Sequence, residues 1–381
     1  MVGEAVTKPE STDFGFGGFF KGKKVLVTGH TGFKGAWLAE WLDLMGAEVG
    51  GLSLYVPSKP SLFEINGLAS RIKHYEADIR DHESVDRIFA EFRPEILFHL
   101  AAQPIVSESY RDPRTTFQTN AIGTLNILEA IRNSADLKAA VLITSDKCYE
   151  NVEWEFGYRE DDRLGGKDPY SASKACAEVV FSSYFRSFFE GKPNLSKIAT
   201  CRAGNVIGGG DWAKDRIVPD CFRAWSTGDG VTLRRPESTR PWQHVLEPLS
   251  GYLLLAQRLY EGKSGLNGES FNFGPPAEVN FPVGDLVARL AAVWGKGNFE
   301  VIPSNMAEAG LLKLCCDKAL HRLGWRPSLA YEDTISLTGN WYRDFYQKDS
   351  DPKQLTLHQI RQYISKANDT RQVWTNVKGH T

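Results

Sequence analysis

The sequence of 381 residues has no long hydrophobic run. No stretch reaches the roughly 18 apolar residues that a membrane-spanning helix needs, and residues 1–20 have no apolar core of signal-peptide length. We therefore expect no membrane contact and a cytoplasmic protein. Lys and Arg total 45 against 47 Asp and Glu, so no overall field attracts nucleic acid.

The sequence also lacks paired cysteines. Its six cysteines show no C-x-x-C spacing, and the adjacent Cys315 and Cys316 suit neither a structural disulfide nor a zinc site. We expect free thiols, a reducing compartment and no bound metal.

A short apolar strand at 23–28 runs directly into a glycine-rich turn. Gly29, Gly32 and Gly35 are spaced as Gly-x-x-Gly-x-x-Gly, and a helical pattern at 37–45 follows. Glycines allow a tight turn and a close backbone approach, so the helix N-terminus can hold a pyrophosphate. A plain strand–helix turn is the alternative, but its place at the first of several such units favours dinucleotide binding.

Strands and helices alternate regularly as far as residue 202. Further strands are expected at 48–54, 74–77, 95–100, 139–144 and 197–201, and helices at 84–92, 114–132 and 170–190. This alternation predicts an α/β fold, a doubly wound parallel sheet of the Rossmann type with ligands at the carboxyl ends of its strands. Beyond 203 the pattern becomes irregular. We expect an extension (1–20), a dinucleotide-binding domain (21–202), a smaller α+β lobe mainly for substrate (203–366) and a polar tail that frays (367–381).

Tyr170 and Lys174 stand at the start of one predicted helix. Asp168 is suited to cap this helix, and Pro169 fits its first turn. A spacing of four residues places the phenol and the ammonium on one helix face. A cation beside a phenol favours the phenolate, so the pair is suited to proton transfer, although this spacing alone also occurs on ordinary helix surfaces.

One expected residue is missing. Dinucleotide sites usually have a carboxylate at the end of the second strand for the adenosine ribose. Here that place falls at Leu54, Tyr55 and Val56, and the next carboxylate is Glu64. No arginine stands there for a 2′-phosphate either.

Five signals in the same order resemble the extended short-chain dehydrogenase/reductase family over roughly residues 22–345. They are the glycine turn, the segment His99 to Ala102, Asn120, Ser145 after its strand, and Tyr170 with Lys174. Within that family the stretches at 28–35, 60–64, 144–151, 202–212 and 240–251 are most similar to those of the CDP-glucose 4,6-dehydratases. A departure from this pattern is Cys315, where relatives usually have an aspartate.

The resemblance implies loss of water from CDP-glucose with NAD as cofactor. Hydride leaves C4 for NAD⁺, water is lost across C5 and C6, and the hydride returns to C6. Tyr170 would be the base at the 4-hydroxyl, supported by Lys174 and Ser145. Asp146 would protonate the departing 6-hydroxyl. Lys147, which stands where related dTDP-sugar dehydratases have a glutamate, would act at C5, or else orient Asp146 or stabilise the enolate.

The non-catalytic alternatives are a turn-forming serine at 145 and a solvated ion pair of Asp146 with Lys147. The cofactor set implied by the resemblance adds to Tyr170 and Lys174 the residues Gly29, Thr31, Gly32, Phe33, Lys34, Gly35, Asp78, Ile79, Leu100, Ala101, Ala102 and Asn120. Asp78 would accept from the adenine amino group, or would instead cap a helix.

The implied nucleotide-sugar set is Gln103, Asn205, Trp212, Arg216, Arg234, Arg240 and His244. Arginine matches phosphate oxygens bidentately, although an exposed arginine such as Arg234 is often only solvated. His30 and His244 are isolated histidines, which are more often structural than ligands.

Two other functions stay open at this point. A nucleotide-sugar 4-epimerase or reductase of the same fold needs no acid at O6, so Asp146 and Lys147 discriminate against it. A non-catalytic NAD-binding regulatory protein could dispense with Tyr170, which is present. The family also implies a homodimer through helices 114–132 and 170–190, and a place in deoxysugar and lipopolysaccharide biosynthesis.

Overall fold

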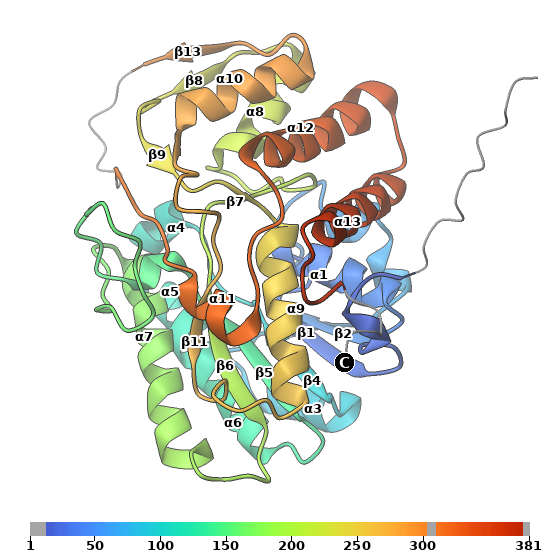
Figure 1. Ribbon diagram of the computed structural model, residues 1–381, viewed down its shortest axis with the longest axis vertical. Coiled ribbons are helices and arrows are strands. Elements are labelled where there is room, and N and C mark those ends of the chain that lie inside the picture. The colour runs from blue at the N-terminus through green and yellow to red at the C-terminus, as the bar shows by residue number, and fades with distance from the viewer. Residues whose placement is uncertain (1–12, 303–309, 376–381) are drawn as a thin grey trace, which may run out of the picture.

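The computed structural model describes residues 13–302 and 310–375. Its centre is a seven-stranded sheet in the order β11-β6-β5-β4-β1-β2-β3, and every neighbouring pair is parallel (Figure 1). The strands are β1 (Lys24–Thr28), β2 (Glu48–Ser53), β3 (Lys73–Glu76), β4 (Ile96–His99), β5 (Ala139–Ile143), β6 (Lys197–Arg202) and β11 (Ser270–Asn272). The predicted doubly wound Rossmann-type sheet is confirmed.

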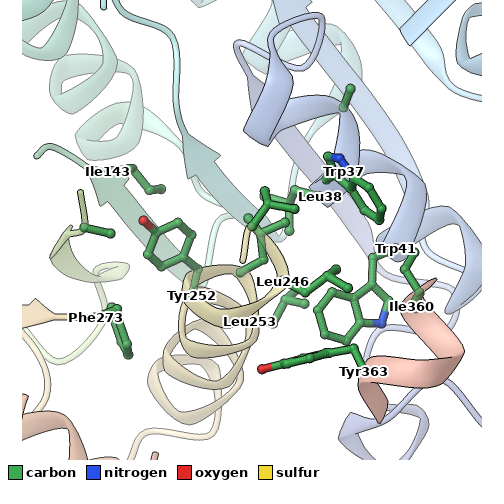
Figure 2. Close-up of a cluster of buried hydrophobic side chains, with 14 of the residues drawn as sticks. Trp37, Leu38, Trp41, Ile143, Leu246, Tyr252, Leu253, Phe273, Ile360 and Tyr363 are labelled. Carbon is green, nitrogen blue, oxygen red and sulfur yellow. The ribbon is translucent and has the colours of Figure 1, made fainter. Parts of the chain in front are cut away.

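Both faces of the sheet are buried, because successive side chains of each strand point to opposite faces. In β1, Val25 and Val27 face one hydrophobic core, and Leu26 faces the other. The first core is closed by α1 (Phe33–Leu44), α9 (Leu246–Tyr260) and α13 (Pro352–Asp369), and the second by α3 (His82–Phe92), α6 (Gly123–Asn133) and α7 (Pro169–Tyr184). Figure 2 shows the first core, where α9 lies between the sheet and aromatic side chains of α1 and α13.

The strand order reverses between β1 and β4. At such a switch point the loops that leave adjacent strands diverge and open a crevice for ligands. The two loops meet at its floor, where a Cβ added to Gly29 would lie 2.7 Å from the backbone nitrogen of Ala101.

The predicted helix 114–132 consists of three helical segments in direct succession. A π-helical turn, Gln118–Ile122, joins α5 (Pro113–Phe117) to α6, and it carries Asn120. A π-helical turn, Phe185–Phe189, also ends α7. Within the described residues, no helix is long and apolar enough to cross a membrane.

The smaller lobe is built from short two-stranded pairings and helices. The strands pair as β7 (Val206–Ile207) with β10 (Gln243–His244), β8 (Val231–Leu233) with β13 (Phe299–Val301), and β9 (Thr239–Arg240) with β12 (Phe281–Pro282). The helices beyond residue 203 that have not yet been named are α8 (Ile217–Thr227), α10 (Val283–Trp294), α11 (Asp317–Leu323) and α12 (Tyr331–Lys348). Two short helices, α2 (Leu62–Ile65) and α4 (Val106–Arg111), lie in the first half of the chain.

The chain beyond the predicted boundary at residue 202 contributes to the central sheet as well as to the smaller lobe. After residue 203 the chain returns to the sheet, where α9 packs against β5 and β6, and β11 pairs with β6 as the edge strand. The central helix α9 is almost wholly buried, which a pattern of alternating strands and helices does not reveal.

The prediction of a frayed tail is wrong for residues 367–375. Trp374 is buried and stacks on Phe16 and Tyr363, with ring centroids 5.1 and 5.6 Å apart. The amide of Phe16 donates to the carbonyl of Trp374 at 2.7 Å. The two ends of the described chain are thus packed together beside α1, and residues 376–381 and 1–12 lie outside the described residues.

Candidate active site

The pair Tyr170 and Lys174 lies on the buried face of α7. The predicted cap is confirmed, since the Asp168 carboxylate accepts from the amide of Ser171 at 2.9 Å and Pro169 begins the helix. Both side chains are less than a tenth exposed, at 8% for Tyr170 and 5% for Lys174. The helix therefore presents both groups to the interior at the carboxyl edge of the sheet.

The loop after β5 approaches the same phenol. Ser145 caps a short 3-10 turn (Asp146–Cys148), and its hydroxyl is hydrogen-bonded to Tyr170. The same hydroxyl donates to Oδ1 of Asp146 at 3.0 Å. Asp146 is 4% exposed and lies against the backbone of Gly204, whereas the side chain of Lys147 is exposed. The alternative of a solvated ion pair of Asp146 with Lys147 is therefore wrong, because the carboxyl is buried and the two side chains lie in different environments.

The phenol is shielded from water. Burial raises the pKa of Tyr170 to about 12, against the opposing effects of the Ser145 hydrogen bond and the charge of Arg216. From the sequence, Lys174 is the cation expected to act on this phenol. In the structure, Arg216 is the cation whose charge lowers the pKa of Tyr170. Arg216 caps α8 and forms an ion pair with Asp211 at 2.9 Å.

Lys34 is a site residue whose setting the sequence did not reveal. Burial lowers its pKa to about 8, assisted by Arg216 and opposed by Asp146. The pKa of Lys174 is also lowered to about 8, by burial and then by the charge of Lys34, while Glu178 raises it. Lys34 thus extends from the glycine turn into the same electrostatic environment as Asp146 and Lys174.

The glycine turn is built for close backbone approach. Gly29 has φ +76°, and a Cβ at Gly35 would collide with the carbonyl oxygen of Gly29. Gly32 is the N-cap of α1 and provides no side-chain cap, so no capping side chain occupies the amides of the first helical turn. Thr31 supports the turn from outside, because its hydroxyl donates to the carbonyl of Tyr55 at 2.7 Å.

Asn120 holds the crevice wall in place. Its Nδ2 donates to Ser173 on α7 at 2.8 Å, and its Oδ1 accepts from the amide of Gln103 at 2.9 Å. The Gln103 carboxamide is itself engaged by Thr116 and the amide of Ile105. Both side chains therefore brace the loop that carries Leu100, Ala101 and Ala102.

The residues expected at the adenosine end have partners within the protein. Asp78 forms an ion pair with Arg80 at 2.6 Å, and the side chain of Ile79 is buried in the second core; their contact with the adenine stays a prediction. The second strand ends at Ser53, whose hydroxyl contacts Nδ1 of His30 at 2.9 Å, and His30 contacts His74 at 2.7 Å. A chain of neutral groups thus occupies the place where a carboxylate is usual.

Two predicted substrate residues, Trp212 and His244, are buried among aromatic side chains. Trp212 is 4% exposed, donates to Tyr346 at 2.8 Å and packs among aromatic rings of α12. His244 is fully buried against Trp37 of α1. Contact of these two rings with the nucleotide sugar stays a prediction. Asn205 has φ +49°, Arg240 is half-buried on β9, and Arg234 is exposed after β8.

Comparison with known proteins places this site in a family. Residues 26–338 match the family model described as GDP-mannose 4,6 dehydratase, and the chain belongs to that family of Rossmann-type sugar-nucleotide enzymes. A relative named CDP-glucose 4,6-dehydratase, from Salmonella typhimurium, is 48% identical over 331 residues, which cover 85% of this chain and 92% of that protein.

More distant relatives share the fold. A UDP-glucose 4-epimerase of Mycolicibacterium smegmatis is 27% identical over 84% of this chain and 99% of its own. The crystal structure of the Thermus thermophilus UDP-glucose 4-epimerase in complex with NAD superposes with a TM-score of 0.72, at 27% identity over 84% of this chain and 98% of that chain. The predicted resemblance to the extended short-chain dehydrogenase/reductase family is confirmed, and the matching family is one of 4,6-dehydratases.

Proposed function

We propose that this protein is an NAD-dependent CDP-glucose 4,6-dehydratase, which converts CDP-D-glucose to CDP-4-dehydro-6-deoxy-D-glucose and water. The 48% identical relative of that name supports the substrate. The observation that carries the reaction type is the buried carboxyl of Asp146, joined to the phenol of Tyr170 through Ser145. An epimerase inverts C4 without an acid at the 6-hydroxyl, so this carboxyl favours dehydration.

The crevice fits a dinucleotide. Gly29, Gly32 and Gly35 leave room for a pyrophosphate over the uncapped start of α1, and the loop at 100–102 forms the opposite wall. When bound, NAD supplies the oxidation at C4 and the later reduction at C6. The neutral Ser53 and His30 at the ribose end offer hydroxyl and imidazole partners without a carboxylate. In the sequence, residues 54–56 after the second strand include no arginine, which favours NAD over NADP.

The protein's own groups divide the proton transfers among themselves. Tyr170 takes the proton of the sugar 4-hydroxyl, and Ser145 holds that oxygen in reach. Arg216 is the cation whose charge favours the phenolate, and Lys174 would hold the nicotinamide ribose, as the family resemblance implies. Asp146 gives a proton to the departing 6-hydroxyl. Lys147 is exposed, so bound substrate must cover it before it can act at C5.

Arginines provide for the diphosphate. Arg216 is ion-paired to Asp211 near the phenol, and Arg234 and Arg240 stand in the smaller lobe on or beside short strands. We infer that these three side chains, with Asn205, bind the CDP moiety.

We further propose a cytoplasmic homodimer that serves deoxysugar and lipopolysaccharide synthesis. The two helices expected to form the interface, 114–132 and 170–190, have exposed apolar side chains. The exposed fractions are 48% for Ile122, 57% for Val179 and 38% for Phe188. Apolar side chains at such exposure favour burial against a second copy.

The experiment is a panel of CDP-, dTDP-, UDP- and GDP-glucose incubated with the purified protein, with products identified by NMR. We expect the 4-keto-6-deoxy sugar from CDP-glucose and slower turnover of the others. A C4 epimer as the product would replace the dehydratase with the epimerase, and inertness toward the whole panel would contradict both.

A further inference from the structure

Glu178 continues the catalytic face of α7 by one more turn. It follows Lys174 by four residues, as Lys174 follows Tyr170, and it is 2% exposed. Its carboxylate accepts from five donors: the hydroxyls of Thr144, Thr200 and Ser270, and Nε and Nη2 of Arg202 at 2.9 and 2.8 Å.

Arg202 completes a closed network around that carboxylate. It is 3% exposed at the end of β6, and its Nη1 donates to the hydroxyl of Tyr149 and to the carbonyl of Glu160, both at 2.8 Å. The guanidinium also lies 4.9 Å from the centre of the Tyr149 ring. The hydroxyl of Tyr149 donates in turn to Asn272 on β11 at 2.8 Å.

The network holds the catalytic loop, Ser145 with the turn 146–148, at both of its ends. Thr144, bound to Glu178, immediately precedes Ser145, and Tyr149, bound to Arg202, immediately follows the turn 146–148. Ion pairs this deeply buried add little net stability compared with apolar packing, because both charges lose their hydration. Their use is more often to specify one arrangement of the groups around them.

We propose that Glu178 and Arg202 are positioning residues for the dehydration, which act through Thr144 and Tyr149 to hold Ser145 and Asp146 against Tyr170. Proton transfer needs its partners within hydrogen-bond reach, and a displacement of about 1 Å can cost a hundredfold in rate. This inference rests on the proposed dehydratase activity.

The test compares two isosteric substitutions, each of which removes one hydrogen-bond donor to the Glu178 carboxylate. Thr144→Val removes the Glu178 hydrogen bond at the catalytic loop, whereas Thr200→Val removes a Glu178 hydrogen bond on β6, away from the loop. Four donors to Glu178 stay in place in either variant. We expect kcat with CDP-glucose to fall about tenfold or more in Thr144→Val, with KM within about twofold. Thr200→Val should keep kcat within about twofold, and Thr144→Ser should restore it.

Thermal unfolding of the three threonine variants distinguishes a loss of positioning from a loss of stability. Equal losses of Tm with unequal losses of kcat support the proposal. Equal kcat in the two valine variants, or a kcat that follows Tm across all three, would overturn it. Tyr149→Phe checks the Arg202 end independently, with an expected fall in kcat of about threefold or more and an unchanged KM. If the parent protein itself fails to turn over CDP-glucose, the proposed function fails and not this inference.

Discussion

The carboxylate of Asp146 lies directly against the α-carbon of Gly204. A Cβ placed on Gly204 would overlap both carboxylate oxygens, and the three atoms nearest to that position among the described residues all belong to Asp146. Gly204 begins the segment that leads from β6 into the smaller lobe. The site thus depends on the absence of one side chain, which leaves room for the Asp146 carboxyl.

Gly204→Ala should therefore displace Asp146 and lower kcat about a hundredfold, because the proton donor loses its geometry. The backbone of Gly204 is outside the left-handed region, so the alanine itself adopts it without strain. Gly274→Ala is the matched control, since its Cβ would lie 3.5 Å from the nearest atom. Steady-state kinetics of both variants check this prediction, and equal activity would contradict the placement of Asp146.

Tyr170→Phe and Asp146→Asn should stop the reaction at different steps. Without the phenol no oxidation occurs, so we expect a loss of roughly 10³-fold with no reduced cofactor. Without the acid, oxidation proceeds but water leaves slowly, so reduced cofactor should accumulate and be visible by its absorbance. An Asp146→Asn variant with parental rate and no absorbance change would show that another group is the acid.

Glu247 should make stability depend on pH. Its buried carboxyl accepts from the amides of Ser328 and Leu329 and from the hydroxyl of Tyr363, and burial raises its pKa to about 7. Because the folded protein holds this proton more tightly than the unfolded chain, the stabilisation is complete below pH 4.5 and is lost between pH 4.5 and about 7.

Glu247→Gln removes this titration. The free energy of unfolding of the variant relative to the parent should rise by about 3 kcal/mol between pH 5 and pH 8. Urea denaturation at the two pH values measures the difference, in which the other titrating groups cancel. A difference that is constant with pH would contradict the assignment.

Trp374→Ala should destabilise the protein by about 3 kcal/mol or more, because the ring is buried among Phe16, Trp41 and Tyr363. Trp374→Phe should cost much less, since it preserves the stacking and the indole nitrogen has no hydrogen-bond partner to lose. Urea denaturation measures both. Equal stability of Trp374→Ala and the parent would return this segment to the status of a frayed tail.

Local rules accounted for much of the fold and the site. The cap at Asp168, the glycine turn at 29–35 and the alternation up to residue 202 each depend on neighbours in sequence, and the structure confirms them. Tertiary packing decided the rest. The return of α9 and β11 to the sheet, the burial of Trp212 and His244, and the packing of Trp374 all depend on partners that are distant in the sequence. Glu178 is intermediate, because its spacing from Lys174 is visible in the sequence but its partner Arg202 is not.

The central claim is that hydrogen removed from C4 of the sugar is delivered to C6 after Asp146 has expelled the 6-hydroxyl. CDP-glucose deuterated at C4 tests this in one measurement, by NMR of the product. Deuterium in the C6 methyl group of a 4-keto sugar is the result we predict. Deuterium retained at C4, in glucose or in its epimer, would contradict it.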